Sequence, residues 1–220
     1  MGFLAVSEAA ERLGVSTRQV QHLVAGGDLR QVARGVLDET SVERLAAVRG
    51  GSHNRAWSEA TAWGAVALLS GAEVNWMGES QRSRLKGRLR RLSAAQLVER
   101  ARERAEITRY RAHSRAGQYL LGELVYATDV ASGLGLAETN SIDGYLAVSD
   151  VDGVVSRHGL FADDAGRVTL RATSMDLEVV RDMSKRGVVL AALDLAESLD
   201  VRERRAGLNA LDAALGSLRA

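Results

Sequence analysis

Apolar positions in the first fifty residues recur at helical spacing, with polar residues between them. Residues 7–13, SEAAERL, predict a helix that begins at Ser7 and turns two alanines and Leu13 inward. Gly14 can supply the left-handed turn residue that ends it. The pattern therefore predicts a short helix followed at once by a tight turn.

A second helix is predicted to begin after Ser16. Ser16 and Gln19 have the spacing of a capping box, and Val15 and Val20 have the spacing of a hydrophobic staple. Val20, Leu23 and Val24 form the inner stripe of this helix. The outward positions are Thr17, Arg18, Gln21 and His22.

The next segment, DLRQVARGVL (28–37), predicts a short two-stranded hairpin that turns near Arg34 and Gly35. A third helix is expected after it, capped by Asp38 or Thr40, with Val42, Leu45 and Ala46 inward. The predicted elements thus follow the order of a winged helix-turn-helix: a helix, a turn, a second helix, a basic hairpin and a third helix. This order places the second helix in the major groove of DNA.

Arginine and glutamine are the side chains that pair bidentately with guanine and adenine edges, and a helix N-terminus can hold a phosphate. The candidate DNA-binding residues are Ser16, Thr17, Arg18, Gln21, His22, Arg30, Gln31 and Arg34. The alternative is a small three-helix module whose polar face is only solvated, since residues 1–50 carry no net charge.

A family resemblance supports the DNA-binding interpretation. The run VSEAAERLGVSTRQVQHLVAGGDL (6–29) and the hairpin after it resemble the excisionase/MerR-like winged helix-turn-helix regulators. The resemblance covers about the first fifty residues. It implies a DNA-binding domain over 1–50, and GGSHN (50–54) is typical of a linker after it.

The middle of the chain, 51–115, predicts helices with a strong positive charge. Residues 55–71 suit a buried helix with Trp57 and Trp63 as core anchors, and residues 80–92 place Leu85, Leu89 and Leu92 on one stripe. Residues 82–115 hold 12 basic and 3 acidic residues, although the whole chain is only +1. The candidate phosphate contacts are Arg82, Arg84, Lys86, Arg88, Arg90 and Arg91.

A further helix is predicted from Ser93, with Gln96 completing a capping box. Its predicted basic residues are Arg100, Arg102, Arg104 and Arg109. Three interpretations of the basic block stay open: a solvated face partly neutralised by the acidic C-terminal region, a contact with the DNA backbone, or a site for an acidic protein or RNA. A membrane-binding helix is not expected, because the leucine stripe is narrow and lacks aromatic anchors.

The last part, 116–220, predicts a mixed α/β domain for dimerisation or partner binding. Residues 122–136 suit a helix, 142–149 a strand and 150–158 a helix, while 166–173 alternate as a half-buried strand with Val168, Leu170 and Ala172 inward. Residues 188–200 and 201–218 predict a closing helix pair with Leu193, Leu208, Leu211 and Leu215 inward. The expected fold class is α+β, mainly α.

A second resemblance spans most of the chain. The segments GYLAVSDVDGVVSRHGL and VLAALDLAESLDVRERRAGLNAL, in this order, are similar to actinobacterial AbiE-type (type IV toxin–antitoxin) antitoxin regulators. Such a resemblance implies a DNA-binding autorepressor and a nucleotidyltransferase toxin as partner.

Enzyme chemistry finds little support in the sequence. The chain has no cysteine, and its four histidines lie far apart without metal-ligand spacing, so no metal site and no cofactor are expected. Asp150 and Asp152 form an i, i+2 carboxylate pair, but the Gly-Ser turn that nucleotidyltransferases need is missing. Ser149 or Asp150 is more simply a helix N-cap.

The sequence therefore predicts a cytoplasmic, non-enzymatic transcriptional regulator that binds double-stranded DNA sequence-specifically, as a repressor of its own operon. A homodimer would suit operator half-sites one helical turn apart. The alternative is an antitoxin that neutralises a toxin by protein contact, with DNA binding secondary. No membrane partner is expected, since no apolar run is long enough to span a bilayer.

Overall fold

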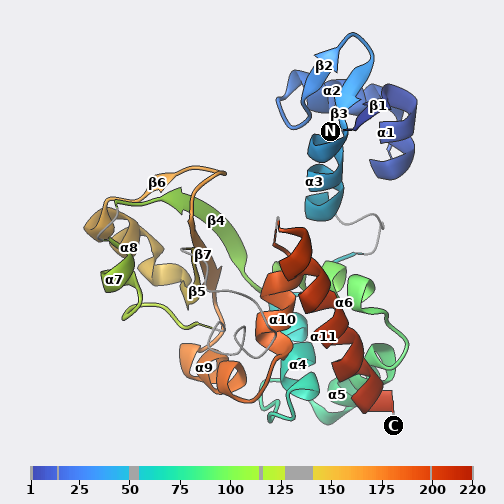
Figure 1. Cartoon of the computed structure of the whole chain (residues 1–220). Helices are drawn as coiled ribbons and strands as arrows, with labels where there is room; N and C mark the ends of the chain where they lie inside the picture. The colour runs from blue at the N-terminus through green and yellow to red at the C-terminus, as the bar shows by residue number, and fades with distance from the viewer. Residues whose placement is uncertain are drawn as a thin grey trace. The chain divides into compact units, whose positions relative to one another are not determined.

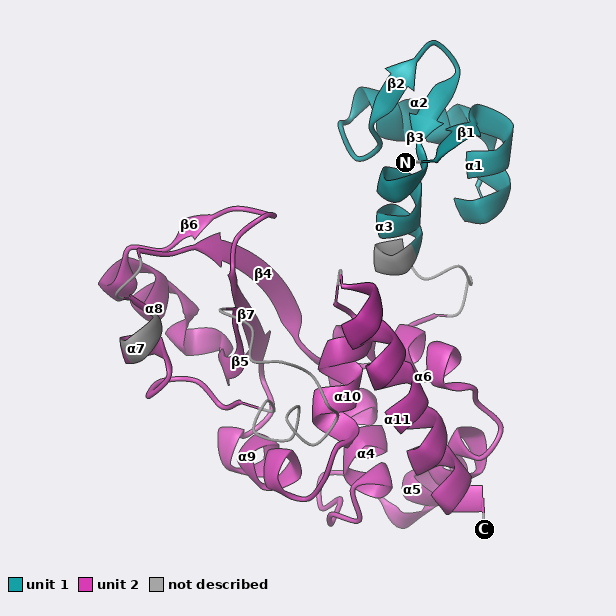
Figure 2. Ribbon diagram, viewed as in Figure 1, with its two compact units in different colours: residues 1–54 teal, residues 55–220 magenta. Residues whose placement is uncertain are grey.

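The fold is a mainly helical α+β arrangement in two compact units, residues 1–54 (unit 1) and 55–220 (unit 2) (Figure 2). The computed structural model describes residues 2–13, 15–49, 55–113, 116–126, 141–198 and 200–219, with the backbone alone at 47–49, 117 and 118. Gly14, the predicted linker 50–54 and residues 127–136 of one predicted helix lie outside the described residues.

Unit 1 contains three helices, α1 (Val6–Leu13), α2 (Thr17–Ala25) and α3 (Glu39–Arg49) (Figure 1). Their apolar stripes meet in one core, as the spacing predicted. The buried members are Leu4, Ala9, Ala10, Leu13, Val20, Leu23, Leu29, Leu37 and Val42. Val15, Leu45 and Ala46 are partly buried against this core.

The start of α1 differs from the prediction by one residue. The helix begins at Val6, and the Glu8 carboxylate accepts a hydrogen bond from the backbone N–H of Ala5 at 2.8 Å. Ser7 therefore lies inside the first turn and is not the cap. A glutamate at the third helical position instead accepts from the backbone N–H of the residue before the helix, which is the glutamate half of a capping box.

A small antiparallel sheet completes unit 1, in the order β1 (Phe3–Ala5), β3 (Val36–Asp38), β2 (Gln31–Ala33). The predicted hairpin is confirmed: β2 and β3 are joined at Arg34 and Gly35, whose φ of +81° is the left-handed conformation that glycine adopts without strain. The sequence did not predict β1, a three-residue strand without clear alternation.

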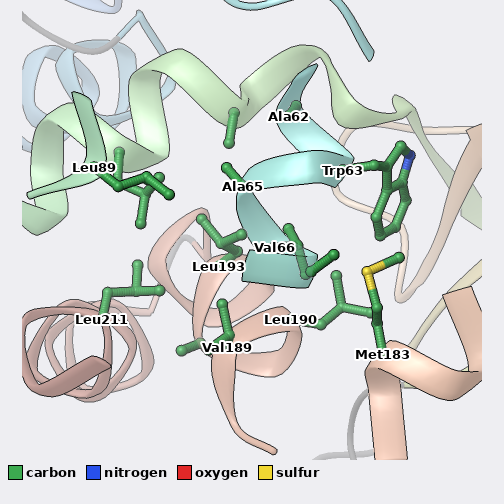
Figure 3. Close-up of a cluster of buried hydrophobic side chains, with 14 of the residues drawn as sticks. Ala62, Trp63, Ala65, Val66, Leu89, Met183, Val189, Leu190, Leu193 and Leu211 are labelled. Carbon is green, nitrogen blue, oxygen red and sulfur yellow. The ribbon is translucent and has the colours of Figure 1, made fainter. Parts of the chain in front are cut away.

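Unit 2 has a helical part whose elements come from both ends of its sequence. It contains α4 (Glu59–Leu69), α5 (Glu79–Leu89), α6 (Ala94–Ala101), α9 (Leu177–Lys185), α10 (Val189–Ala196) and α11 (Val201–Arg219). Figure 3 shows side chains of α4, such as Trp63 and Val66, among those of the late helices, such as Met183 and Leu190. The core anchors Trp57 and Trp63 are both buried, as predicted.

The predicted closing pair corresponds to α10 and α11. Leu193, Leu211 and Leu215 are fully buried and Leu208 is half-buried. The two helices approach closely at Gly207, where an added Cβ would lie 2.5 Å from the Ala192 carbonyl oxygen. Only a residue without a side chain permits this helix contact.

The second part of unit 2 is a four-stranded sheet in the order β5 (Ile142–Ala147), β7 (Val168–Thr173), β4 (Glu106–Arg111), β6 (Phe161–Ala162). β5 and β7 are parallel, and the other pairs are antiparallel. Two short helices, α7 (Ala116–Leu120) and α8 (Val151–His158), contribute Leu120 and Val154 to the apolar cluster that holds Leu170. Short 3₁₀ turns lie at Arg102–Arg104 and Val148–Asp150.

Strand β7 differs from the predicted alternation. Val168 and Leu170 are buried as expected, but Ala172 is only half-buried, whereas Arg171 and Thr173 are buried. The reason is that both faces of this central strand are covered: Val168 and Leu170 pack in the apolar cluster on one face, and Arg171 lies among charged partners on the other.

The predicted division into 1–50, 51–115 and 116–220 differs from the two compact units. Residues on both sides of 115 share a single core, which includes Trp63, Leu97, Tyr145, Leu190 and Leu211. Within the predicted helix 122–136, the described residues 122–126 form turns, and Val125 pairs with Tyr145 through an isolated bridge.

Candidate nucleic-acid interface

Helix α2 is held at its N-terminus by Ser16, as the sequence predicted. The Ser16 hydroxyl oxygen accepts a hydrogen bond from the backbone N–H of Gln19 at 3.2 Å. In the described residues the reciprocal bond of a full capping box is not formed, and the Gln19 side chain is exposed. This one bond, together with the packing of Val15 and Val20 in the core, fixes the start of α2.

The two faces of α2 separate core from solvent. Val20 and Leu23 are buried, with exposed fractions of 0% and 3%. The side chains on the opposite side are all exposed: Thr17, Arg18, Gln21 and His22. The structure thus brings the predicted polar residues onto one solvent-facing side of a single helix.

The β2–β3 hairpin adds a second group of exposed polar residues, Arg30, Gln31 and Arg34. Ser41, a buried residue that sequence analysis missed, ties the hairpin to α3. Its hydroxyl accepts from Arg30 N–H at 3.2 Å and donates to the Asp38 carbonyl at 2.7 Å. Asp38 is the cap of α3, because its carboxylate accepts from Ser41 N–H at 3.1 Å.

The cations of this surface have no acidic partners. Within the part of unit 1 that the structure describes, Arg18, Arg30 and Arg34 form no ion pair, whereas Arg12 is paired with Glu39 at 2.8 Å. Unpaired guanidinium groups on α2 and on the hairpin are therefore open to an external anion.

The six cations of the basic block divide into two groups. Arg84, Lys86 and Arg88 are exposed on α5. Arg82 is half-buried and donates to the Val74 carbonyl at 3.4 Å, and Arg90 donates to the Leu218 carbonyl at 3.2 Å.

The exposed Arg91, in the turn after α5, donates to the carbonyl of Gly87 at 3.2 Å, four residues earlier. Among the ion pairs of the described residues, none involves any of the six. Direct pairing with the acidic C-terminal region is therefore not seen for these six cations, although Arg104 and Arg111, which also lie within 82–115, pair with carboxylates of that region.

The helix predicted from Ser93 is α6, with its capping box to Gln96 confirmed. It ends at Ala101, however, so three of the four arginines assigned to it, Arg102, Arg104 and Arg109, lie elsewhere. Arg104 closes a 3₁₀ turn with only 1% of its side chain exposed, and Arg109 lies on strand β4. Their placement on an exposed basic helix was wrong, because the chain leaves the helix and enters the sheet of unit 2.

Arg104 is the centre of a buried polar cluster. Its guanidinium donates to both carboxylate oxygens of Glu197 and to Asp194 Oδ1, each at 2.7 Å. Its Nε donates to the Tyr145 hydroxyl at 3.0 Å, and that hydroxyl donates to Asp194 Oδ1 at 2.5 Å. Every side-chain partner of Arg104 comes from a distant part of the sequence, and one further bond runs to the nearby carbonyl of Ala101 at 3.3 Å.

Arg171 extends this cluster along strand β7. It donates to both oxygens of Asp143, at 2.6 and 2.9 Å, and to Glu197 Oε2 at 2.7 Å. Glu197 therefore bridges the two buried arginines and joins α10 to the sheet. Sequence analysis missed this role of Arg171, because its position in an apolar strand was the only available signal.

Burial and charge act differently on the members of the cluster. Burial raises the pKa of Tyr145 well above its ordinary value, which keeps its hydroxyl protonated as a donor. Burial also raises the pKa of Asp194, despite the nearby Arg171 and Arg104. For Glu197 burial acts in the same direction, but the charges and hydrogen bonds of the two arginines lower its pKa below the ordinary value.

The carboxylate pair Asp150 and Asp152 lies at the junction of the 3₁₀ turn and α8. Both are exposed, and Asp150 is the N-cap residue of α8 without a side-chain capping bond. The described ranges contain no group of three or more histidine, cysteine, aspartate or glutamate residues arranged to hold a metal ion. Among the same residues, no helix has the length and apolar character needed to cross a bilayer.

Comparison with known proteins returned no match: no family model fits the chain, and neither a curated protein nor a solved structure resembles it significantly.

Proposed function

We propose that unit 1 is a winged helix-turn-helix module and that α2 enters the major groove of double-stranded DNA. The observation that carries this proposal is the exposed row Thr17, Arg18, Gln21 and His22 opposite the buried Val20 and Leu23. A helix anchored on one side and polar on the other is what the groove admits.

Each side chain has a role in this complex. Arg18 reads a guanine edge, Gln21 reads an adenine edge, and His22 lies beside them. Ser16 and Thr17, at the N-terminus of α2, hold a backbone phosphate. On the hairpin, Arg30, Gln31 and Arg34 reach the adjacent backbone or minor groove.

The function that follows is sequence-specific regulation of transcription, as a repressor of the protein's own operon and without enzymatic activity. Because phosphate attraction dominates affinity and unit 1 has no net charge, one copy of unit 1 binds weakly. A homodimer on two half-sites, or a second contact from the same chain, supplies the missing affinity.

The test is a full-length Arg18→Ala/Gln21→Ala variant, compared with wild type on fragments selected from genomic DNA. Each good bidentate base contact contributes about 1–3 kcal/mol of discrimination. The variant is expected to lose its preference for the selected fragments over random DNA, while the salt dependence of binding stays nearly unchanged.

Arg44→Ala is the matched control, because Arg44 is an exposed arginine on a different helix, α3. It should bind like wild type. If the double variant retained the wild-type preference, α2 would not be the reading helix, and the proposal would be rejected.

The alternative role, an antitoxin acting on a nucleotidyltransferase toxin through protein contact, stays a prediction from the resemblance. No contact among the described residues favours it over DNA binding.

A further inference from the structure

Helix α5 presents two cationic flanks on either side of its buried stripe. Leu85 and Leu89 face the core of unit 2, with exposed fractions of 2% and 0%. At 3.6 residues per turn, Arg84 and Arg88 lie on one flank, one helical turn apart, whereas Lys86 lies on the opposite flank. Arg91, in the turn after α5, continues the row of Arg84 and Arg88.

The opposite flank is occupied by the C-terminus of the chain. Arg90 donates to the Leu218 carbonyl at 3.2 Å, and Arg219 donates in return to the carbonyls of Arg90 and Leu92, at 3.0 and 2.6 Å. A cation at the last carbonyl groups of a helix is stabilising. Arg90 and Arg219 therefore join α5 to α11 and have a structural role.

The row Arg84, Arg88 and Arg91 is exposed and has no acidic partner among the described residues. Gly87 lies between these arginines on the same side, and a Cβ added there would meet nothing within 4 Å. A side chain introduced at Gly87 would therefore lie beside the arginine row without a clash.

The chemistry of this surface favours phosphate over protein. Among the described residues, the large exposed apolar side chains all lie outside 74–105. Protein interfaces usually have an apolar or aromatic centre, which this flank lacks. Arginine, in contrast, binds phosphate oxygens bidentately, and successive turns of a helix repeat about every 5.4 Å.

We propose that Arg84, Arg88 and Arg91 form a second, sequence-independent contact of this protein with the phosphate backbone of double-stranded DNA. The choice of DNA as the polyanion rests on the function proposed for unit 1. The contact supplies the electrostatic affinity that unit 1 lacks because its net charge is zero, while sequence preference remains with α2.

Substitutions at Gly87 test the contact without removing any arginine. Gly87→Glu places a negative charge inside the row, and Gly87→Lys adds a fourth cation. Both replace glycine by a better helix former, so neither should lower the Tm. Gly87→Ala is the matched control for helix propensity, with no change in charge.

The measurement is the Kd of the full chain for a random-sequence duplex over a range of salt concentrations. Since each phosphate contact adds about 0.9 to the slope of log K against log salt, Gly87→Glu should weaken binding about 5- to 50-fold at 0.1 M salt and flatten the slope. Gly87→Lys should tighten binding, and Gly87→Ala should equal wild type. Equal affinity of the Glu and Lys variants would overturn the proposal.

A second pair of variants distinguishes an effect of the Arg84, Arg88 and Arg91 row on duplex binding from an effect of the net charge of α5. Arg88→Gln and Lys86→Gln each remove one charge from α5, on opposite sides. Arg88→Gln should weaken duplex binding several-fold and Lys86→Gln should leave it nearly unchanged. Equal losses would show that only net charge matters, and a preference for polyglutamate over duplex would assign the row to an acidic protein. Either result refutes the proposal.

These outcomes are independent of those for α2. A wild-type sequence preference in Arg18→Ala/Gln21→Ala would reject the function proposed for unit 1. Unchanged random-duplex binding in Gly87→Glu would reject the second contact and leave that function standing.

Discussion

The arginines of the two units occupy opposite environments. In unit 1, Arg18, Arg30 and Arg34 are exposed and form no ion pair within the described residues. In unit 2, Arg104 and Arg171 have only 1% and 3% of their side chains exposed, and carboxylates surround both. These arginines are thus buried structural residues in unit 2 and exposed residues in unit 1. The two environments differ in whether carboxylates lie next to the guanidinium group.

The difference follows from the cost of desolvating a charge. A guanidinium can be buried only when charged and hydrogen-bonded partners replace water. Glu197 and Asp194 do this for Arg104, and their α10 helix is thereby joined to the sheet through Tyr145. An exposed arginine without a partner keeps its hydration and its availability to a ligand.

Removing a buried arginine should give the largest effect. Arg104→Met leaves Glu197 and Asp194 buried without their main cation, so the free energy of unfolding of unit 2 should fall by about 3–5 kcal/mol. Urea unfolding measures the loss, and hydrogen exchange should show unit 1 unchanged. Arg18→Met, the same change on the exposed side of α2, should alter stability by less than about 0.5 kcal/mol. Similar losses for both variants would contradict the contrast between the units.

The pH dependence of stability offers a finer test within the buried cluster. Folding lowers the pKa of Glu197, so its stabilising contribution is complete above its unfolded-state pKa, about 4.3, and is lost as the pH falls through the lower folded-state value. The destabilisation caused by Glu197→Gln should therefore be large at pH 7 and shrink below pH 4.

Asp194→Asn is the opposing control. Folding raises the pKa of Asp194, because burial disfavours its ionised form. The contribution of Asp194 to the free energy of unfolding is therefore greatest when it is protonated, and it falls as the pH rises through the folded-state pKa. The destabilisation caused by Asp194→Asn should decrease toward neutral pH. Urea unfolding between pH 3 and 7 measures both trends, and a pH-independent difference for Glu197→Gln would refute the assigned charge state.

Helix caps provide the smallest comparison between the units. Ser16 caps α2 through one bond, whereas Ser93 and Gln96 form a complete capping box at α6. Replacing either serine by alanine should cost about 0.5–2 kcal/mol, with Ser93→Ala toward the upper end. Thermal unfolding with hydrogen exchange should assign the first loss to unit 1 and the second to unit 2. A larger loss from Ser16→Ala would show that the single bond supports more than the start of α2.

The sequence by itself determined the features that depend on neighbours within a few residues. Each of these features needs only partners three or four positions away or a local backbone conformation. They are the cap at Ser16, the buried Val20 and Leu23, the turn at Gly35 and the capping box at Ser93. The exposed row on α2 follows from the same periodicity.

Only the tertiary structure decided which arginines are buried and that residues on both sides of 115 belong to one unit. Asp194 and Glu197 meet Arg104 from about 90 residues away. Both faces of β7 are buried because side chains from distant elements pack on them, Leu120 and Val154 on one face and Glu197 on the other. The spacing of residues within a short segment does not indicate such distant partners. Arg104 and Arg109 were therefore predicted to lie on a basic helix. The long-range packing of charges and strands, which no short window of sequence contains, separates the structural arginines from those available to DNA.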